Sequence, residues 1–347
     1  MQNDASKYML EAVALAEKAW GMTSPNPLVG AVIVKDGAII GRGFHKQAGT
    51  PHAEINALAD AGKLPRCADL YVTLEPCSTY GRTPPCTDAI IRSGIGRVFI
   101  GSTDPNPAHA GRGEEILRDA GIEVITGIEQ TACDALNEAF FKWITNKMPF
   151  VLLKMAMTLD GKIATESGQS QWITGPEARL RVQHLRQWAD AILVGGSTAR
   201  QDHPSLTVRG IPGWRQPRRI VASKTLTQEE LKTLLPEGEP AEIISAASPL
   251  EWLAVMRRLG SENVTALLIE GGGELAAEVI AAGIVDKVEF HIAPKILGGR
   301  NSRPVLGGTN PASLAEALAL KNISVSRISE DIVITGYPDY SAPSGSA

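Results

Sequence analysis

Four residues in the first half of the chain have the types and the spacing of a catalytic zinc site. They are His52 and Glu54, two positions apart, then Cys77 directly after a proline, and finally Cys86. One imidazole and two thiolates can bind zinc and leave its fourth tetrahedral position to water, whose pKa then falls to about 7. A carboxylate beside that water can take its proton, carry it to a ring nitrogen and later protonate departing ammonia. The pattern therefore predicts hydrolytic deamination, with Glu54 as the proton shuttle.

The spacing of the two cysteines departs from the general signature of zinc-dependent nucleobase deaminases. That signature is His-x-Glu followed by Pro-Cys-x-x-Cys, whereas residues 78–85 separate Cys77 from Cys86 in this chain. A loop must therefore bulge out between two ligands that other deaminases hold on one helical turn.

A structural zinc site is the alternative interpretation, but such sites are usually closed by four protein ligands. The remaining cysteines, Cys67 and Cys133, have no paired spacing to the others and are interpreted as core or incidental residues. His45 and His109 are interpreted as polar loop residues rather than ligands.

The second half has no further cysteine, but it contains a glycine turn between a strand pattern and a helix pattern. Residues 264–269 read as the strand, 270–273 (EGGG) as the turn and 274–281 as the helix. Free backbone N–H groups and the helix dipole at such a turn can hold a phosphate. The match to G-x-G-x-x-A lies late in the domain, so a Rossmann fold does not follow, and a purely structural turn is nearly as probable on this pattern alone.

Basic residues near glycine turns in the second half could bind an anionic ligand. A solvated protein surface is the alternative explanation of the same set. Its members are Lys154, Arg179, Arg181, Arg186, Arg200 and Arg209.

The first half alternates strand and helix patterns, which predicts a three-layer α/β domain. Asp36-Gly37 suits a hairpin turn because both residues tolerate positive φ. The expected elements are a helix at 8–20, strands at 29–34 and 38–41, a helix at 53–61, a strand at 70–74, a helix at 87–92, a strand at 98–101, a helix at 114–120, a strand at 122–126 and a closing helix at 131–146.

We expect the first domain to end at Met148, because Pro149 disfavours a helix before it. A second α/β series follows, with strands at 150–157, 191–194, 219–222, 264–269 and 287–292, helices at 176–188, 250–259 and 274–281, and two final strands at 323–328 and 332–336. The predicted organisation is therefore a domain at 1–148, a domain at 149–338 and a flexible tail at 339–347.

Composition excludes several classes of protein. With 347 residues, 44% of them hydrophobic and 21% charged, the chain reads as globular and long enough for two domains. A net charge of -4 gives no counterion-release drive toward nucleic acid. The longest apolar run, 264–285, is broken by three glutamates, and the first residues lack a signal-peptide pattern. We therefore expect a cytoplasmic enzyme of small molecules without a membrane span, in which thiols stay reduced.

Longer stretches of the first half resemble the deaminase domain of the RibD family of bifunctional riboflavin biosynthesis proteins. The resemblance lies in residues 24–34 (SPNPLVGAVIV), 49–54 (GTPHAE), 73–86 (TLEPCSTYGRTPPC), 104–107 (DPNP) and 111–113 (GRG). It implies a cytidine-deaminase-like α/β/α fold, zinc bound by His52, Cys77 and Cys86, Glu54 as proton shuttle, and Asn26 as a contact to the pyrimidine. Thr79 departs from the family, in which histidine is frequent at this position.

The second half resembles the reductase half of the same family, which is similar in fold to dihydrofolate reductase. The matching stretches are 153–164 (LKMAMTLDGKIA), 170–174 (SQWIT), 190–195 (DAILVG), 202–209 (DHPSLTVR) and 269–272 (IEGG). The resemblance implies NADPH as cofactor, with contacts from Ala156, Trp172, Thr198, Asp202, Ser223, Gly272, Gly273, Glu274, Leu275, Ala276, Ala277 and Glu278. It implies ribose-phosphate contacts from Ser170, Arg186, Leu206, Arg209 and Glu270, and acid-base work for Lys154.

These observations predict a bifunctional enzyme of riboflavin synthesis. The first half would deaminate 2,5-diamino-6-ribosylamino-4(3H)-pyrimidinone 5′-phosphate, and the second would reduce the ribosyl side chain with NADPH to give 5-amino-6-ribitylamino-uracil 5′-phosphate. One alternative is a nucleoside or RNA-base deaminase with a non-catalytic second domain, and another is a zinc-stabilised regulator. Relatives suggest a homo-oligomer, and the pattern leaves open whether the intermediate is channelled.

Overall fold

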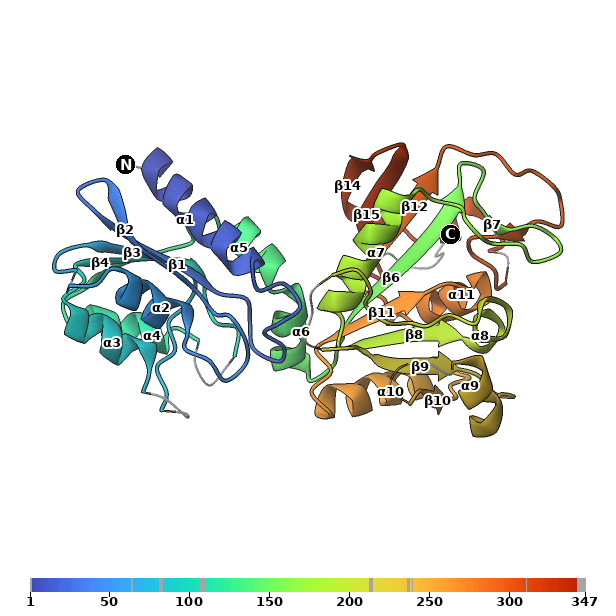
Figure 1. The fold of residues 1–347 in the computed structure, drawn as a ribbon, viewed down its shortest axis with the longest axis horizontal. Helices are drawn as coiled ribbons and strands as arrows, with labels where there is room; N and C mark the ends of the chain where they lie inside the picture. The colour runs from blue at the N-terminus through green and yellow to red at the C-terminus, as the bar shows by residue number, and fades with distance from the viewer. Residues whose placement is uncertain are drawn as a thin grey trace. The chain divides into compact units, whose positions relative to one another are not determined.

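The computed structural model describes residues 2–63, 65–80, 84–106, 110–211, 215–235, 238, 240–309 and 311–341. The chain divides into two compact units, residues 1–147 and 148–347 (Figure 1). None of the helices in the described ranges is long and apolar enough to cross a membrane.

The first unit is built on a five-stranded sheet in the order β2-β1-β3-β4-β5. β1 runs antiparallel to β2 and β3, while β3, β4 and β5 are parallel. The strands are β1 (Gly30–Lys35), β2 (Ala38–Phe44), β3 (Asp69–Leu74), β4 (Arg97–Ser102) and β5 (Glu123–Thr126), and the helices are α1 (Gln2–Glu17), α2 (Ala53–Asp60), α3 (Cys86–Ser93), α4 (Arg112–Asp119), α5 (Gln130–Leu136) and α6 (Glu138–Asn146).

Helices cover both faces of this sheet, because successive strand residues point to opposite sides. Ala31 and Ile33 of β1 pack in one core with side chains of α2, α3 and α4. Val32 and Val34 pack in a second core with side chains of α1 and α5. The unit therefore has three layers, and the carboxyl end of β3 leads directly to Cys77.

Two glycines of β2 bring helix α2 unusually close to the sheet. A Cβ atom on Gly43 would lie 2.2 Å from the backbone oxygen of Ala53, and one on Gly41 would lie 2.4 Å from that of Ala57. Any larger residue would push the helix away. The position of the first turn of α2, where His52 and Glu54 lie, therefore depends on these glycines.

The second unit is built on an eight-stranded sheet in the order β10-β9-β8-β11-β6-β12-β15-β14, with a small sheet of β13 and β7 beside it. The strands from β10 to β12 are parallel, and β15 and β14 are antiparallel additions. The strands are β6 (Phe150–Thr158), β7 (Lys162–Ala164), β8 (Ala191–Gly195), β9 (Arg218–Ala222), β10 (Glu242–Ile244), β11 (Ala266–Glu270), β12 (Lys287–Ala293), β13 (Arg303–Pro304), β14 (Leu320–Ile328) and β15 (Asp331–Pro338).

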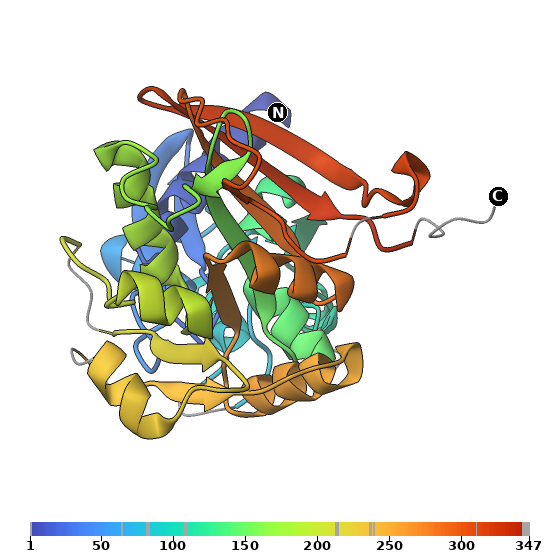
Figure 2. The ribbon, with the colours of Figure 1, turned by 90° about the vertical axis from the view of Figure 1, so that its right-hand side faces the viewer.

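Five α-helices and one 3-10 turn complete the described part of this unit. Side chains of α10 and α11 pack on one face of the sheet, and side chains of α7, α8 and α9 pack on the other. In Figure 2 the hairpin β14–β15, in red, forms the upper edge of the unit. The helices are α7 (Pro176–Trp188), α8 (Gly196–Asp202), α9 (Gln228–Leu234), α10 (Pro249–Ser261) and α11 (Gly273–Ala281), with the 3-10 turn at Leu314–Glu316.

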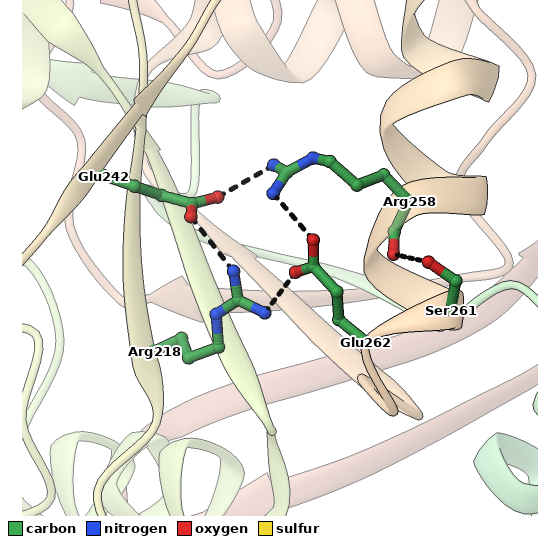
Figure 3. Close-up of polar contacts among 5 residues, drawn as sticks. All are labelled: Arg218, Glu242, Arg258, Ser261 and Glu262. Carbon is green, nitrogen blue, oxygen red and sulfur yellow. Dashed lines mark hydrogen bonds and ion pairs between the residues drawn. The ribbon is translucent and has the colours of Figure 1, made fainter.

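A surface ion-pair network ties β9, β10 and the end of α10 together (Figure 3). Glu242 accepts from Arg218 at 3.0 Å and from Arg258 at 2.9 Å. Glu262 accepts from the same two arginines at 2.6 and 3.3 Å. All four side chains are partly exposed, so solvent weakens each ion pair. The role of the network is to connect these three elements on the surface.

The expected closing helix at 131–146 is in fact two helices, α5 and α6, which meet at Asn137. The Asn137 amide oxygen accepts from the Leu28 backbone N–H at 2.8 Å, and its amide nitrogen donates to the Leu28 carbonyl at 2.9 Å. This pairing with a residue far away in the sequence interrupts the helix at Asn137. The local sequence pattern does not indicate it. The sequence reading also missed the short elements β7, α8, α9, β10 and β13.

Candidate active sites

His52, Cys77 and Cys86 lie together at the end of the first unit's sheet. The His52 Nδ1 atom is 3.5 Å from Cys77 Sγ and 3.3 Å from Cys86 Sγ. The ligand atoms of all three lie within 4.8 Å of one another, which fits a single zinc ion. His52 caps the start of α2 and Cys86 begins α3, so the positive ends of two helix dipoles face the thiolates.

The electrostatics of this cluster favour a thiolate at Cys77. The pKa of the Cys77 thiol falls because the Cys86 side chain hydrogen-bonds to it, with His52 adding to the effect. The Cys86 backbone N–H also donates to Cys77 Sγ at 3.3 Å. A thiolate at Cys77 carries a negative charge, which attracts a metal cation to the site.

Glu54 lies in the first turn of α2 with only 3% of its surface exposed. Burial, followed by the charge of Cys77, raises the pKa of its carboxyl to about 7. It also interacts with the Cys86 side chain. A carboxyl in this position can both accept and donate a proton near neutral pH, as the sequence reading expects.

Asn26 lies beside the cluster, where His45 holds it. The Asn26 amide nitrogen is 3.1 Å from His45 Nε2, and His45 Nδ1 is 3.2 Å from the Pro51 carbonyl. A carbonyl can only accept, so Nδ1 carries the proton and Nε2 accepts from Asn26. The Asn26 oxygen is then left to accept from a ligand. His45 follows β2 in a loop, yet it is buried. Its ring packs edge-on against the His52 ring, with 5.4 Å between the two ring centroids.

Glu75 fixes the chain just before Cys77. Its buried carboxylate accepts from the backbone N–H groups of Asp104, Gly111 and Gly113 at 3.1, 3.0 and 2.8 Å. A Cβ atom on Gly113 would lie 2.3 Å from the Pro76 oxygen, so only glycine allows this approach. Asp104 and residues 111–113, which belong to two of the family motifs, thus lie at the end of β3, just before Cys77.

The other residues noted in the first half have different positions. Cys67 is exposed and has a positive φ of 58°, while Cys133 belongs to α5 and is buried in the core. Thr79 is exposed. Residues 81–83 and His109 lie outside the described residues.

The second unit has a cavity of about 1150 Å³ at the carboxyl ends of β6, β8 and β11. That volume suits a dinucleotide together with a substrate. Thirteen of the reductase residues that the family resemblance implies line it: Lys154, Ala156, Ser170, Trp172, Arg186, Thr198, Asp202, Leu206, Arg209, Glu270, Gly272, Gly273 and Glu274.

Five residues expected at NADPH do not line this cavity. Leu275 and Ala276 are buried in the core, and Ala277 lies against the segment at Gly308. Glu278 accepts from the Trp252 indole at 3.2 Å, and the Ser223 hydroxyl accepts from the backbone of Thr225 and Leu226. Their contact with the cofactor stays a prediction.

The glycine turn before α11 opens onto the cavity. Gly271 and Gly272 have φ of +74° and +67°, and a Cβ atom on Gly272 would lie 2.9 Å from the Thr198 hydroxyl. Only glycine suits both conditions. The backbone at the start of α11 can therefore approach a phosphate, which fits the nucleotide that the resemblance implies.

An ion pair and a buried lysine form one wall of the cavity. Arg186 Nε and Nη2 lie 2.7 and 2.9 Å from the two carboxylate oxygens of Glu270. Burial lowers the pKa of the neighbouring Lys154 ammonium group. Nearby, the Ser170 hydroxyl donates to Asp202 at 3.0 Å.

Comparisons with known proteins match both units. Residues 2–102 match the family model of the cytidine and deoxycytidylate deaminase zinc-binding region, and 149–334 match that of the RibD C-terminal domain. The riboflavin biosynthesis protein RibD of Synechocystis is 45% identical over 95% of both chains, and that of Actinobacillus pleuropneumoniae is 43% identical over 94% of this chain and 93% of its own. This chain belongs to the RibD family.

Solved structures agree with that assignment. Acinetobacter baumannii RibD is 34% identical and superposes with a TM-score of 0.87 over 98% of this chain and 100% of its own. A Thermotoga maritima protein described as a diaminohydroxyphosphoribosylaminopyrimidine deaminase/5-amino-6-(5-phosphoribosylamino)uracil reductase is 36% identical, with a TM-score of 0.83 over 97% of this chain and 99% of its own.

RibD membership confirms the expected fold and the bifunctional activity. The first unit is a cytidine-deaminase-like zinc domain, and the second is a reductase domain of the dihydrofolate-reductase type. The chain is therefore a deaminase and reductase of riboflavin biosynthesis that uses Zn²⁺ and NADPH. The match of the second half argues against the alternative of a non-catalytic second domain.

Sequence reasoning missed three residues that the structure places at or behind the sites, namely Glu75, Glu289 and His291. The last two had a readable signal, since they alternate as polar residues along the otherwise mostly apolar strand β12 (KVEFHIA). Two polar side chains on one face of a central strand indicate a buried polar cluster.

Proposed function

We propose that the first unit hydrolyses 2,5-diamino-6-ribosylamino-4(3H)-pyrimidinone 5′-phosphate at C2. The second unit then reduces the ribosyl side chain, giving 5-amino-6-ribitylamino-uracil 5′-phosphate. The observation that carries this proposal is that one chain contains both the His-Cys-Cys cluster with buried Glu54 and a large cavity with a paired arginine.

In the deaminase site, His52, Cys77 and Cys86 would hold the zinc ion. Zinc supplies a water activated for attack on C2. Glu54 takes the proton released as the C2–O bond forms and passes it to the ring nitrogen. It then takes the remaining proton of the new C2 hydroxyl and gives it to the amino group, so that the C2=O bond forms as the C2–N bond breaks and ammonia leaves. The Asn26 oxygen accepts a hydrogen bond from the pyrimidine and orients it.

In the reductase site, Arg186, Arg209 and Ser170 would hold the ribose phosphate, since an arginine fork gives a phosphate two fixed donors. Opening of the ribose ring leaves a double bond between C1′ and the exocyclic nitrogen. Reduction adds a hydride from NADPH to C1′ and a proton to that nitrogen. Lys154, which lines the cavity, is the proposed donor of this proton.

One assay on the full chain tests both steps. Ammonia release and NADPH absorbance are followed together with the diaminopyrimidinone phosphate as substrate, with and without a zinc chelator. We expect ammonia to appear first and NADPH oxidation to depend on it, and the chelator to stop both. NADPH oxidation without ammonia would contradict the proposed order of the two steps.

We also propose that the chain forms a homo-oligomer through β14. This strand is the last in its sheet, and within the described residues no further strand pairs with its outer edge. Ile323 and Val325 on it are 60% and 65% exposed. An exposed apolar edge strand offers unpaired backbone N–H and C=O groups to which a second chain can pair. Sedimentation of the full chain as a monomer at micromolar concentration would contradict this.

We further propose a cytoplasmic enzyme whose ligands are small molecules rather than nucleic acid. Free cysteine thiols support the reducing compartment. The net charge of -4 supports the absence of a phosphate-backbone partner.

A further inference from the structure

Lys154 lies between two carboxylates in the sheet of the second unit. It is paired in register with Glu270 of β11 on one side and with Glu289 of β12 on the other. Residues in register on neighbouring parallel strands lie about 4.8 Å apart with side chains on the same face. Both carboxylates therefore act on the same ammonium group, and both contribute to its electrostatic environment.

Each of the two carboxylates is held by one arginine of α7. Arg186 forms two hydrogen bonds with Glu270, and Arg181 forms two with Glu289 at 3.2 and 3.1 Å. His291 Nε2 adds a third contact to Glu289 at 2.8 Å. Glu289 is 2% exposed and His291 is fully buried, so this arrangement is fixed inside the protein.

The two ion pairs differ in their position relative to the cavity. Arg186 and Glu270 line the cavity, whereas Arg181, Glu289 and His291 are absent from its described lining. Among the described residues, no hydrogen bond to Lys154 Nζ is found, although the side chain lines the cavity. Glu289 therefore does not line the cavity itself, but it lies beside Lys154, which does.

The charge state of Lys154 is set by groups on four elements. Burial favours the neutral amine and lowers its pKa. Glu270 on β11, Glu289 on β12 and Asp331 on β15 favour the ammonium form, and Arg186 on α7 opposes it. Arg181 and His291 contact Glu289 directly. Burial lowers the pKa of His291.

We propose that Glu289 is a positioning residue of the reductase, whose carboxylate, held by Arg181 and His291, keeps Lys154 protonated and directed into the cavity. This rests on the proposed role of Lys154. As the hydride forms the new C1′–H bond, the Lys154 ammonium gives its proton to the exocyclic nitrogen, the C=N double bond becomes single, and NADPH is oxidised to NADP⁺. The neutral lysine recovers a proton from solvent.

The test is the pH profile of reductase kcat, measured by NADPH absorbance on the full chain with deaminated intermediate supplied. Glu289→Gln removes a negative charge, so the alkaline limb should move to lower pH by about one unit. Arg181→Met removes a positive charge from the same cluster, so the limb should move to higher pH. Glu289→Asp should restore most of the wild-type limb. Two substitutions that only disturbed the fold would not move the alkaline limb of the pH profile in opposite directions.

Two controls separate the inference from the proposed function. Lys154→Met should lower kcat at least about 100-fold at every pH. Glu242→Gln is the matched control, because it removes a carboxylate that also pairs with arginine, in the surface network of Figure 3. It should leave the pH profile unchanged.

The outcomes are distinct. An inactive Lys154→Met with wild-type pH limbs in both Glu289→Gln and Arg181→Met overturns the role of Glu289 alone. A fully active Lys154→Met overturns the proposed role of Lys154 and this inference with it. If Glu289→Gln does not fold, the pH profile of Arg181→Met is the remaining test. The Arg181 side chain is 39% exposed, so its loss is easier to tolerate.

Discussion

Glu54 shows how much chemistry one buried side chain adds to a metal site. His52, Cys77 and Cys86 leave the fourth position of a zinc ion open, and the carboxyl two residues after the histidine adds a proton carrier beside it. Its burial holds the pKa near 7, where the same group can accept and return a proton within one turnover.

Replacing Glu54 with glutamine should separate the metal from the catalysis. We expect Glu54→Gln to keep zinc, because the ligands are untouched, but to lower ammonia release by about 100-fold or more, since amide cannot carry the proton. Ammonia assay and zinc content of the purified variant are measured together. Unchanged ammonia release with zinc retained would refute the proton-shuttle role.

At the reductase site, Arg209 is one of the three side chains that we propose to hold the ribose phosphate. Arg209 lines the cavity and its backbone N–H donates to the Gln183 side chain at 2.9 Å. We expect Arg209→Ala to raise the reductase KM about tenfold or more while zinc content stays the same, since a contact to the anionic substrate is lost. A normal KM would mean that the phosphate lies elsewhere.

Three elements of the first unit meet at Glu75. The end of β3, the loop after β4 and the start of α4 are joined because one carboxylate accepts several backbone N–H groups. Without it the buried N–H group of Gly113 would lose this hydrogen bond. The loop that carries Cys77 is thus placed by a residue that does not bind the metal.

Glu75→Gln should therefore weaken both the fold and the metal site of the first unit. An amide keeps one acceptor but loses the charge, so we expect a loss of about 1–3 kcal/mol in the free energy of unfolding and release of zinc at lower temperature. Thermal unfolding with a zinc-sensitive dye measures both. Glu115→Gln is the control and should change little, because it removes an exposed carboxylate from the first turn of α4, the helix whose start Glu75 binds. Equal stability of the two variants would contradict the role of Glu75.

The whole chain contains two units with separate cores, and each candidate site is made from one unit alone. The metal-binding residues belong to the first and the cavity residues to the second. Because no described residue is shared, the two activities should be separable within the intact protein.

Cys86→Ser tests this separation. We expect loss of zinc and of ammonia release, because serine is a poor zinc ligand, while NADPH oxidation with supplied deaminated intermediate stays within about twofold of wild type. Metal analysis and the two assays on one preparation decide it. A folded variant that has lost both activities would show that the units depend on each other.

Short-range patterns were enough to predict the α/β class, the glycine turn at 270–273, and the set His52, Glu54, Cys77 and Cys86, which the structure brings together. Each of these depends on residues close together in the chain, where helix and strand periods and ligand spacing are readable. The family resemblance added the residues of the reductase cavity.

Only the tertiary structure decided which distant residues meet. Asn137 breaks a helix because it pairs with Leu28, and Glu289 lies beside Lys154 because β12 is the neighbour of β6 in the sheet. Strand order and register follow from burial of both sheet faces by helices from the whole unit. That is a property of long-range packing, so no local spacing in the sequence records it.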